Sequence, residues 1–137
     1  MSNPVPGTVR VIVTGSRHWS DEDPIADALR RLRGKHGDQL LVVHGDCRTG
    51  ADRIARELCR ALDIRQERHP ADWDRHGRAA GPIRNRAMVA QGADLVLAYV
   101  EGESRGTRGL IALAELAGIE VRVTDAAPTP ATGAGAA

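Results

Sequence analysis

Three short segments of the chain combine glycine with hydroxyl-bearing or basic residues, and this combination suits an anionic ligand. In the first segment, GSR at 15–17, Gly15 allows close approach of the backbone and Ser16 supplies a hydroxyl group. Arg17 adds a planar guanidinium group, which pairs with phosphate oxygens through two parallel hydrogen bonds. We therefore expect this segment to hold a phosphate group.

The second segment, HGDCRTGAD at 44–52, lies between a short apolar run and an amphipathic helical pattern. Thr49 and Asp52 fit the spacing of a capping box, which predicts the start of a helix. Asp46 and Asp52 are candidates to accept hydrogen bonds from ribose hydroxyls, although for Asp46 stabilisation of a turn is an equally open reading. The residues of this segment that we place at the ligand site are Gly45, Asp46, Thr49, Gly50 and Asp52.

The third segment, VEGESRGTRG at 100–109, places Ser104, Gly106 and Thr107 directly before an apolar helical pattern. Backbone N–H groups and the helix dipole attract phosphate at such a start, with about 0.3–1 kcal/mol for each charge–dipole contact. An ordinary Ser/Thr helix cap is the alternative reading. Neither GxGxxG nor GxxxxGK[ST] occurs in the chain, so no motif points to ordinary NAD or Mg-ATP binding.

The long connection at 69–91 supplies the remaining candidates. Arg84 and Arg86 are expected to lie at the start of a helix. The helix dipole disfavours a cation there unless an anion lies nearby. We therefore expect Arg84 to bind a second anionic group of the ligand. Asn85 is placed at the site beside it, and Trp73 is a candidate for stacking on a base. The histidines of this connection lack the spacing of metal ligands, so we expect no metal and no other cofactor.

Strand-like and helix-like patterns alternate along the chain. Five runs predict strands, namely VRVIVT (9–14), QLLVVH (39–44), IRQERH (64–69), DLVLAY (94–99) and IEVRV (119–123). Between them apolar residues recur at helical spacing, at Ile25, Ala28, Leu29 and Leu32, at Ile54, Leu58 and Leu62, at Ile83, Ala87 and Ala90, and at Leu110, Leu113, Ala114 and Ala117.

This alternation predicts an α/β fold, a doubly wound parallel sheet of about five strands in the order 3-2-1-4-5 with helices on both faces. Ligands bind such sheets at the carboxyl ends of the strands, where the winding reverses. The site is therefore expected in the loops after Thr14, His44 and Tyr99. Near the first strand, Asp23 is expected to cap a helix, and Trp19 either stacks on a base or plugs the core.

Length, charge and cysteine content restrict the class of protein. A chain of 137 residues is the size of one domain, expected over 1–125, and the small residues, Pro and Gly of 126–137 predict a disordered tail. The net charge of +1 gives no whole-chain attraction to nucleic acid. No apolar run reaches the roughly 18 residues of a membrane helix, and the two cysteines show no CxxC spacing. We therefore expect a soluble, cytoplasmic protein without a membrane partner.

Four segments in fixed order carry a family resemblance: VTGSR (13–17), HGDCRTGAD (44–52), DWDRHGRAAGPIRNRAM (72–88) and ADLVLAYVEGESRGT (93–107). Together they resemble the SLOG superfamily of Rossmann-like domains, most closely the branch related to YspA and YpsA. The resemblance implies a ligand that is a nucleotide, ADP-ribose or another NAD derivative, or a nucleotide sugar. It also implies a homo-oligomer, and it makes the HGD and TGAD motifs one wall of the ligand pocket.

LOG-type phosphoribohydrolases, which cleave the base from a riboside phosphate, are one kind of relative within this resemblance. They carry Arg followed by Lys-x-x-Met and, later, PGGxGTxxE. Here Arg84 and Met88 match the first motif with Asn85 in place of lysine, and GT at 106–107 matches the second. RGL at 108–110 stands where the glutamate is expected. Whether the chain catalyses a reaction is therefore left open.

In place of that glutamate, Arg84 and Asp46 are the candidates for a catalytic role, with Glu101 and Glu103 as further carboxylates nearby. DprA-type relatives, which load single-stranded DNA, share RNR at 84–86, but the near-neutral charge and the few aromatic side chains argue against nucleic acid as a partner. The sequence thus predicts binding or sensing of a phosphorylated nucleoside-derived ligand. The alternatives are N-glycosidic hydrolysis of a nucleoside 5′-monophosphate and, second, binding of single-stranded nucleic acid.

Overall fold

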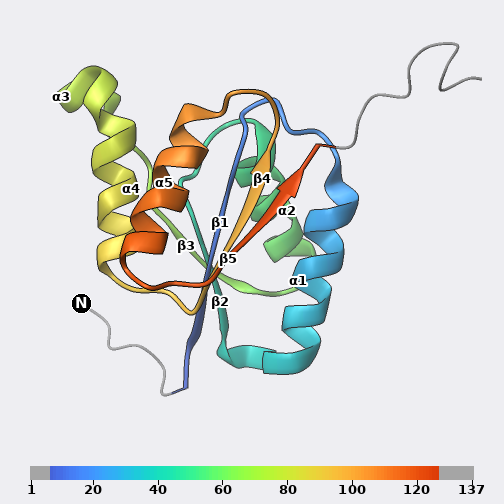
Figure 1. Ribbon diagram of the computed structural model, residues 1–137. Coiled ribbons are helices and arrows are strands. Elements are labelled where there is room, and N and C mark those ends of the chain that lie inside the picture. Colours follow the sequence, from blue (N-terminus) through green and yellow to red (C-terminus); the bar gives the residue numbers. More distant parts are fainter. Residues whose placement is uncertain (1–6, 127–137) are drawn as a thin grey trace, which may run out of the picture.

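Five parallel strands form one sheet in the order β3-β2-β1-β4-β5 in the computed structural model, which describes residues 7–126 (Figure 1). The strands are β1 (Val9–Gly15), β2 (Leu40–His44), β3 (Arg65–Arg68), β4 (Leu95–Val100) and β5 (Val121–Asp125). The predicted order is confirmed, and each strand begins and ends within two residues of its predicted run. In the central register, Ile12 pairs with Val43 on one side and with Val96 on the other.

Helices cover both faces of the sheet, as the sequence predicts. The helices of more than one turn are α1 (Glu22–His36), α2 (Gly50–Ala61), α4 (Ala80–Ala90) and α5 (Arg105–Leu116). The short ones are α3 (Trp73–His76), η1 (Gly37–Gln39) and η2 (Gly77–Ala79). Side chains of β1 alternate between two cores: Val11 and Val13 pack with α1 and α2, and Ile12 packs with α4 and α5. Burial on both faces explains the continuous aliphatic run of the central strands.

The buried stripe of α4 differs from the predicted one. Ala87 and Ala90, expected to face the core, are exposed, whereas Met88 and Val89 are buried in the core beneath α5. Alanine carries little information about direction because burying it yields so little apolar area. The two larger side chains fix the orientation of the helix instead.

The segment between β1 and α1 also differs in detail from the sequence prediction. Asp21, rather than Asp23, caps α1, since its carboxylate accepts a hydrogen bond from the Asp23 amide (3.1 Å). Trp19 is 3% exposed and packs in the core, with its ring centroid 5.4 Å from that of Tyr99. Its indole Nε1 donates to the backbone oxygen of Asp21 (2.6 Å). Trp19 is therefore part of the hydrophobic core and does not offer its ring for stacking on a ligand.

Two further observations concern the C-terminal segment and the lengths of the helices. The tail expected to be disordered lies outside the described residues except for Ala126, whose amide donates to the Val100 carbonyl (2.9 Å). Within residues 7–126, every helix is too short or too polar to cross a membrane.

A polar network replaces apolar packing at β3, whose side chains include two arginines, a glutamine and a glutamate. Arg10 of β1 forms a two-pronged contact with Glu67, with Nη1 and Nη2 donating to the two carboxylate oxygens at 3.0 and 2.9 Å. His69 Nε2 lies 2.6 Å from the same carboxylate. Arg10 Nε also donates to the Gly92 carbonyl (2.9 Å), so the network ties β3 and β1 to the end of α4.

These contacts predict an acid-dependent loss of stability. Hydrogen bonds from Arg10, with a further one from His69, lower the pKa of Glu67 from 4.5 to about 2. The stabilisation is therefore complete above pH 4.5 and is lost as the pH falls towards 2, because the unfolded chain takes up the proton first. Chemical denaturation of wild type and Glu67→Gln should show a difference in unfolding free energy that is constant near neutrality and shrinks below pH 4.5. A difference independent of pH would contradict this assignment.

Candidate functional site

A cavity of about 700 Å³ opens at the carboxyl ends of β1 and β4, the edge where the winding of the sheet reverses. We call it the first cavity. The predicted site residues that line it are Gly15, Ser16, Arg17, Asp52, Trp73, Arg84, Asn85, Ser104, Gly106 and Thr107. Of the other predicted residues, Gly45, Asp46 and Thr49 line an adjoining second cavity, and Gly50 lines neither.

The loop after β1 forms the wall of the first cavity next to the sheet. A Cβ atom at Gly15 would lie 2.6 Å from the Ala51 Cβ atom and 2.7 Å from the Tyr99 carbonyl oxygen, so only glycine lets this loop pass between β4 and α2. The Ser16 amide donates to that same carbonyl (2.9 Å), and the Ser16 hydroxyl accepts from the His18 amide (3.1 Å). These contacts hold the loop in place and leave Arg17 exposed at the cavity.

The opposite wall is the start of α5, which has no side-chain cap. Ser104 lies in the left-handed region (φ 44°), and its hydroxyl donates to the Glu101 carbonyl (2.7 Å) instead of accepting from the helix. The reading of Ser104 as an ordinary helix cap is therefore wrong. The first turn also holds no acidic residue that would balance the positive end of the helix dipole. Arg105, Gly106 and Thr107, the first three residues of α5, all line the first cavity.

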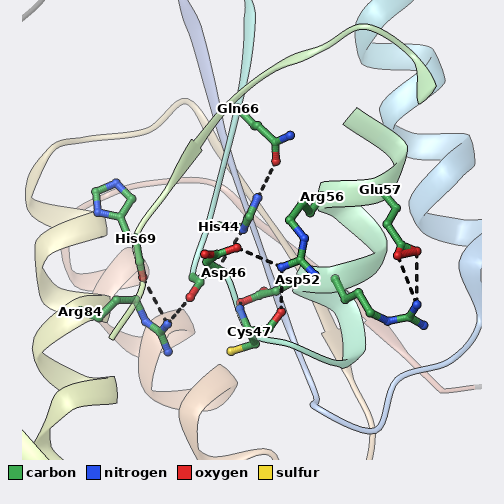
Figure 2. A network of polar contacts seen from close by, with 11 residues as sticks. His44, Asp46, Cys47, Asp52, Arg56, Glu57, Gln66, His69 and Arg84 are labelled. Carbon is green, nitrogen blue, oxygen red and sulfur yellow. Dashed lines mark hydrogen bonds and ion pairs between the residues drawn. The ribbon is translucent and has the colours of Figure 1, made fainter. Parts of the chain in front are cut away.

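Arg84 links three of the segments that surround the cavity, and Figure 2 shows its contacts with the two segments that follow β2 and β3. Its Nη1 atom donates to the carbonyl oxygens of Gly45 (2.8 Å) and His69 (3.4 Å), which follow β2 and β3. Its Nε atom donates to Asn85 Oδ1 (2.8 Å), and Asn85 Nδ2 donates in turn to the Gly106 carbonyl in the first turn of α5 (3.2 Å). Nη2 makes no hydrogen bond to any residue in the described range 7–126.

The position of Arg84 corrects the electrostatic argument made from the sequence. Because α4 begins at Ala80, Arg84 and Arg86 lie in its second turn and do not open the helix. Gly81 and Pro82, at the actual start of the helix, line the first cavity and were missed. The Gly-Pro pair was the available signal, since proline is favoured in a first helical turn and disfavoured farther along.

Gly45 and Gly50 permit close packing of the segments around the two cavities. A Cβ atom at Gly45 would lie 2.7 Å from the guanidinium carbon of Arg84 and 2.9 Å from Asp52 Oδ2. Gly50 has a φ of 73°, and its Cβ atom would lie 2.7 Å from the Arg17 Cα atom. These two glycines let Arg84 and the start of α2 approach the neighbouring loops.

The two aspartates proposed as ribose ligands have different surroundings. Asp46 adopts a φ of 55°, its amide donates to Nδ1 of the buried His44 (3.0 Å), and its carboxylate pairs with Arg56 (2.9 Å). The role in stabilising the turn is thus the one that these contacts support, and Asp46 lines the second cavity. Asp52 is 7% exposed, lines the first cavity and accepts from the Cys47 amide (3.3 Å). Thr49 takes the N-cap position of α2 but forms no side-chain cap.

Cys47 lines both cavities, in surroundings that disfavour its thiolate form. Burial, with added repulsion from Asp52, raises the pKa of its thiol from 9.0 to about 11. Among residues 7–126, no three histidine, cysteine, aspartate or glutamate side chains are grouped so as to hold a metal ion.

Arg17 and Trp73 approach each other across the mouth of the cavities. The guanidinium carbon of Arg17 lies 5.4 Å from the centre of the Trp73 ring, within the range of a cation–π contact. Trp73 is 46% exposed, which is unusual for so large an apolar side chain. Both residues line both cavities.

Comparison with known proteins supports the resemblance read from the sequence. The sequence model of the YspA, cpYpsA-related SLOG family matches residues 9–76, which include the segments after β1 and β2. The chain is 43% identical over 117 residues to the Gene 61 protein of Mycobacterium phage D29, and this alignment covers 82% of the chain and 93% of that protein. No solved structure matches the chain.

The contacts of Arg84 predict a structural role as well as a binding role. Arg84→Ala should lower the free energy of unfolding by about 1.5–3 kcal/mol, because it leaves the Gly45 carbonyl oxygen and the Asn85 Oδ1 atom without their charged donor. Arg86→Ala is the matched control: the residue is exposed on the same helix, and its substitution should change stability by less than about 0.5 kcal/mol. Equal unfolding free energies of the two variants in urea would contradict the linking role.

The raised thiol pKa predicts slow modification of Cys47. Its alkylation by iodoacetamide, followed by peptide mass spectrometry, should accelerate about tenfold per pH unit from pH 7 to 10 without reaching a plateau, since the pKa is about 11. Asp52→Asn should speed the reaction at a given pH, because it removes the repulsion that Asp52 exerts on the thiolate. A plateau near pH 9 in wild type would show an unperturbed thiol.

Proposed function

Because this chain belongs to the YspA, cpYpsA-related SLOG family, we propose that it binds a phosphorylated nucleoside derivative in the first cavity. Membership of the family suggests a nucleotide-related role. The observation that carries the proposal is the uncapped start of α5, which faces the same cavity as the guanidinium groups of Arg17 and Arg84. A nucleotide, ADP-ribose or another NAD derivative, and a nucleotide sugar all carry the phosphate that this arrangement would bind.

The phosphate is assigned to the first turn of α5. Backbone N–H groups of Gly106 and Thr107 supply donors, and the helix dipole adds about 0.3–1 kcal/mol for each contact with a negative charge. Arg17, exposed across the cavity, contributes a charge-assisted hydrogen bond of roughly 1.5–3 kcal/mol. Micromolar affinity corresponds to about −8 kcal/mol, so the contacts with the phosphate require further contacts with the nucleoside to reach it.

The nucleoside is assigned to the remaining lining. The Asp52 carboxylate, held by the Cys47 amide, is suited to accept hydrogen bonds from ribose hydroxyls. Trp73 offers an aromatic surface for the base, and stacking of this kind contributes about 1–3 kcal/mol. This orientation places the phosphate at α5 and the sugar near α2.

Hydrolysis of the N-glycosidic bond is the second candidate function, favoured by the carboxylates in the first cavity. Asp52 is buried there, and Glu101 and Glu103 line the cavity ahead of α5. One of them would have to take the place of the glutamate missing after the GT pair, as general base or as stabiliser of the positive charge that develops on the ribose. Chromatographic detection of free base from a nucleoside 5′-monophosphate tests this, and loss of the product in Asp52→Asn would assign the carboxylate.

Substitution at Gly106 tests the phosphate site without disturbing the fold. A Cβ atom at Gly106 meets no atom within 4 Å, so Gly106→Asp fits and adds an acid to a first turn that has none. We expect an unchanged or higher melting temperature, because the acid favours the helix dipole, together with at least about a tenfold loss of affinity for AMP or ADP-ribose by calorimetry.

Gly109→Asp is the matched control, since Gly109 is also exposed with open space but lies in the second turn, outside the lining of the cavity. It should retain wild-type affinity. Absence of heat with AMP, ADP-ribose and NAD would remove the proposed function, and equal binding by Gly106→Asp and wild type would remove the phosphate from α5.

A further inference from the structure

The second cavity, of about 610 Å³, adjoins the first and has a much more positive lining. Six arginines and one aspartate line it, namely Arg17, Arg48, Arg56, Arg60, Arg68, Arg84 and Asp46. In the first cavity the charged groups are balanced, with three arginines facing one aspartate and two glutamates. The two cavities therefore differ in charge although they share Arg17, Cys47, Trp73 and Arg84.

The fold explains only part of this positive charge. Asp46 pairs with Arg56 alone (2.9 Å), at a half-buried position. The side chains of Arg48, Arg60 and Arg68 make no hydrogen bond or ion pair with any group of the described chain. Arg60 is accounted for by the helix dipole, because it lies in the last turn of α2. Arg48 gains nothing of this kind, since it lies just before the start of the same helix, where a cation is disfavoured.

The arginines of the second cavity line a concave surface, and this distinguishes them from arginines on an ordinary solvated face. Isolated arginines on a convex surface repel one another little, because water screens them. A cavity lined with one sign of charge concentrates the field and attracts oppositely charged ligands. Guanidinium groups in particular match the geometry of phosphate oxygens. The unpaired arginines of the second cavity are thus suited to a phosphoryl group and not to a neutral ligand.

We propose that the second cavity binds a second phosphoryl group of the same ligand, so that the ligand is a nucleoside carrying phosphoryl groups at two separate positions, such as a nucleoside bisphosphate. This inference rests on the proposed function of the first cavity. The residues shared by the two cavities carry the link: Arg17 and Trp73 line both and lie against each other, so a nucleoside that contacts this pair reaches both sites. Arg48, Arg60 and Arg68 then hold the second phosphoryl group.

The test compares two nucleotides that differ by one phosphoryl group, AMP and adenosine 3′,5′-bisphosphate. By calorimetry, wild type should bind the bisphosphate at least tenfold more tightly than AMP. The variant Arg48→Gln, Arg60→Gln, Arg68→Gln should lose this preference while binding AMP within twofold of wild type. The control variant Arg30→Gln, Arg78→Gln, Arg86→Gln removes the same charge from exposed arginines that line neither cavity, and it should keep the preference.

The possible failures are distinguishable. Equal affinity of wild type for AMP and the bisphosphate would overturn the second site and leave the proposed function standing. If neither nucleotide binds, the proposed function fails, and titration with inorganic pyrophosphate then examines the second cavity alone: no binding, or binding equal in the two triple variants, overturns it as a phosphoryl site. Affinity for single-stranded oligonucleotides that rises with length would replace the bisphosphate with nucleic acid and overturn the proposal.

Discussion

The hydrogen bonds of one guanidinium group, that of Arg84, hold the candidate site together. They join the carbonyl groups that follow β2 and β3, and through Asn85 they reach the first turn of α5. Backbone carbonyl groups of two separate loops have no reason to converge unless a donor with several N–H groups lies between them, and arginine is the side chain that provides such a fork. Gly45 is the complement of this interaction, because any side chain there would occupy the space of the guanidinium group.

The two helices that begin at this edge of the sheet differ in the partners at their N-terminal ends, and this difference would orient a ligand in the cavity. The start of α2 already has partners within the protein: Asp52 lies in its first turn, and the Ala51 amide donates to the Ser16 carbonyl (3.3 Å). The start of α5 has no acid and no side-chain cap. An anion therefore gains most at α5, while hydroxyl groups find their acceptor at α2. The same asymmetry would orient any nucleotide, whatever reaction follows.

The sheet could be predicted from the sequence because its signals are local. Aliphatic runs separated by helical patterns allow few connections, and the order of the strands follows from right-handed crossovers. The side chains of the site follow from contacts that no local pattern reveals. Asp46 and Asp52 looked equivalent, yet a positive φ directs one towards Arg56, while the other is buried in the first cavity. The orientation of α4 was likewise set by Met88 packing beneath a distant helix.

An NMR titration of the ¹⁵N-labelled protein with AMP examines the central claim, that the free N–H groups of α5 hold a phosphate, at the atoms concerned. The account predicts saturable shifts of the Gly106 and Thr107 amide resonances, with smaller changes at Arg17 and none along the outer face of α1. Shifts confined to other regions, or amide resonances of α5 that stay in place at millimolar AMP, would contradict it.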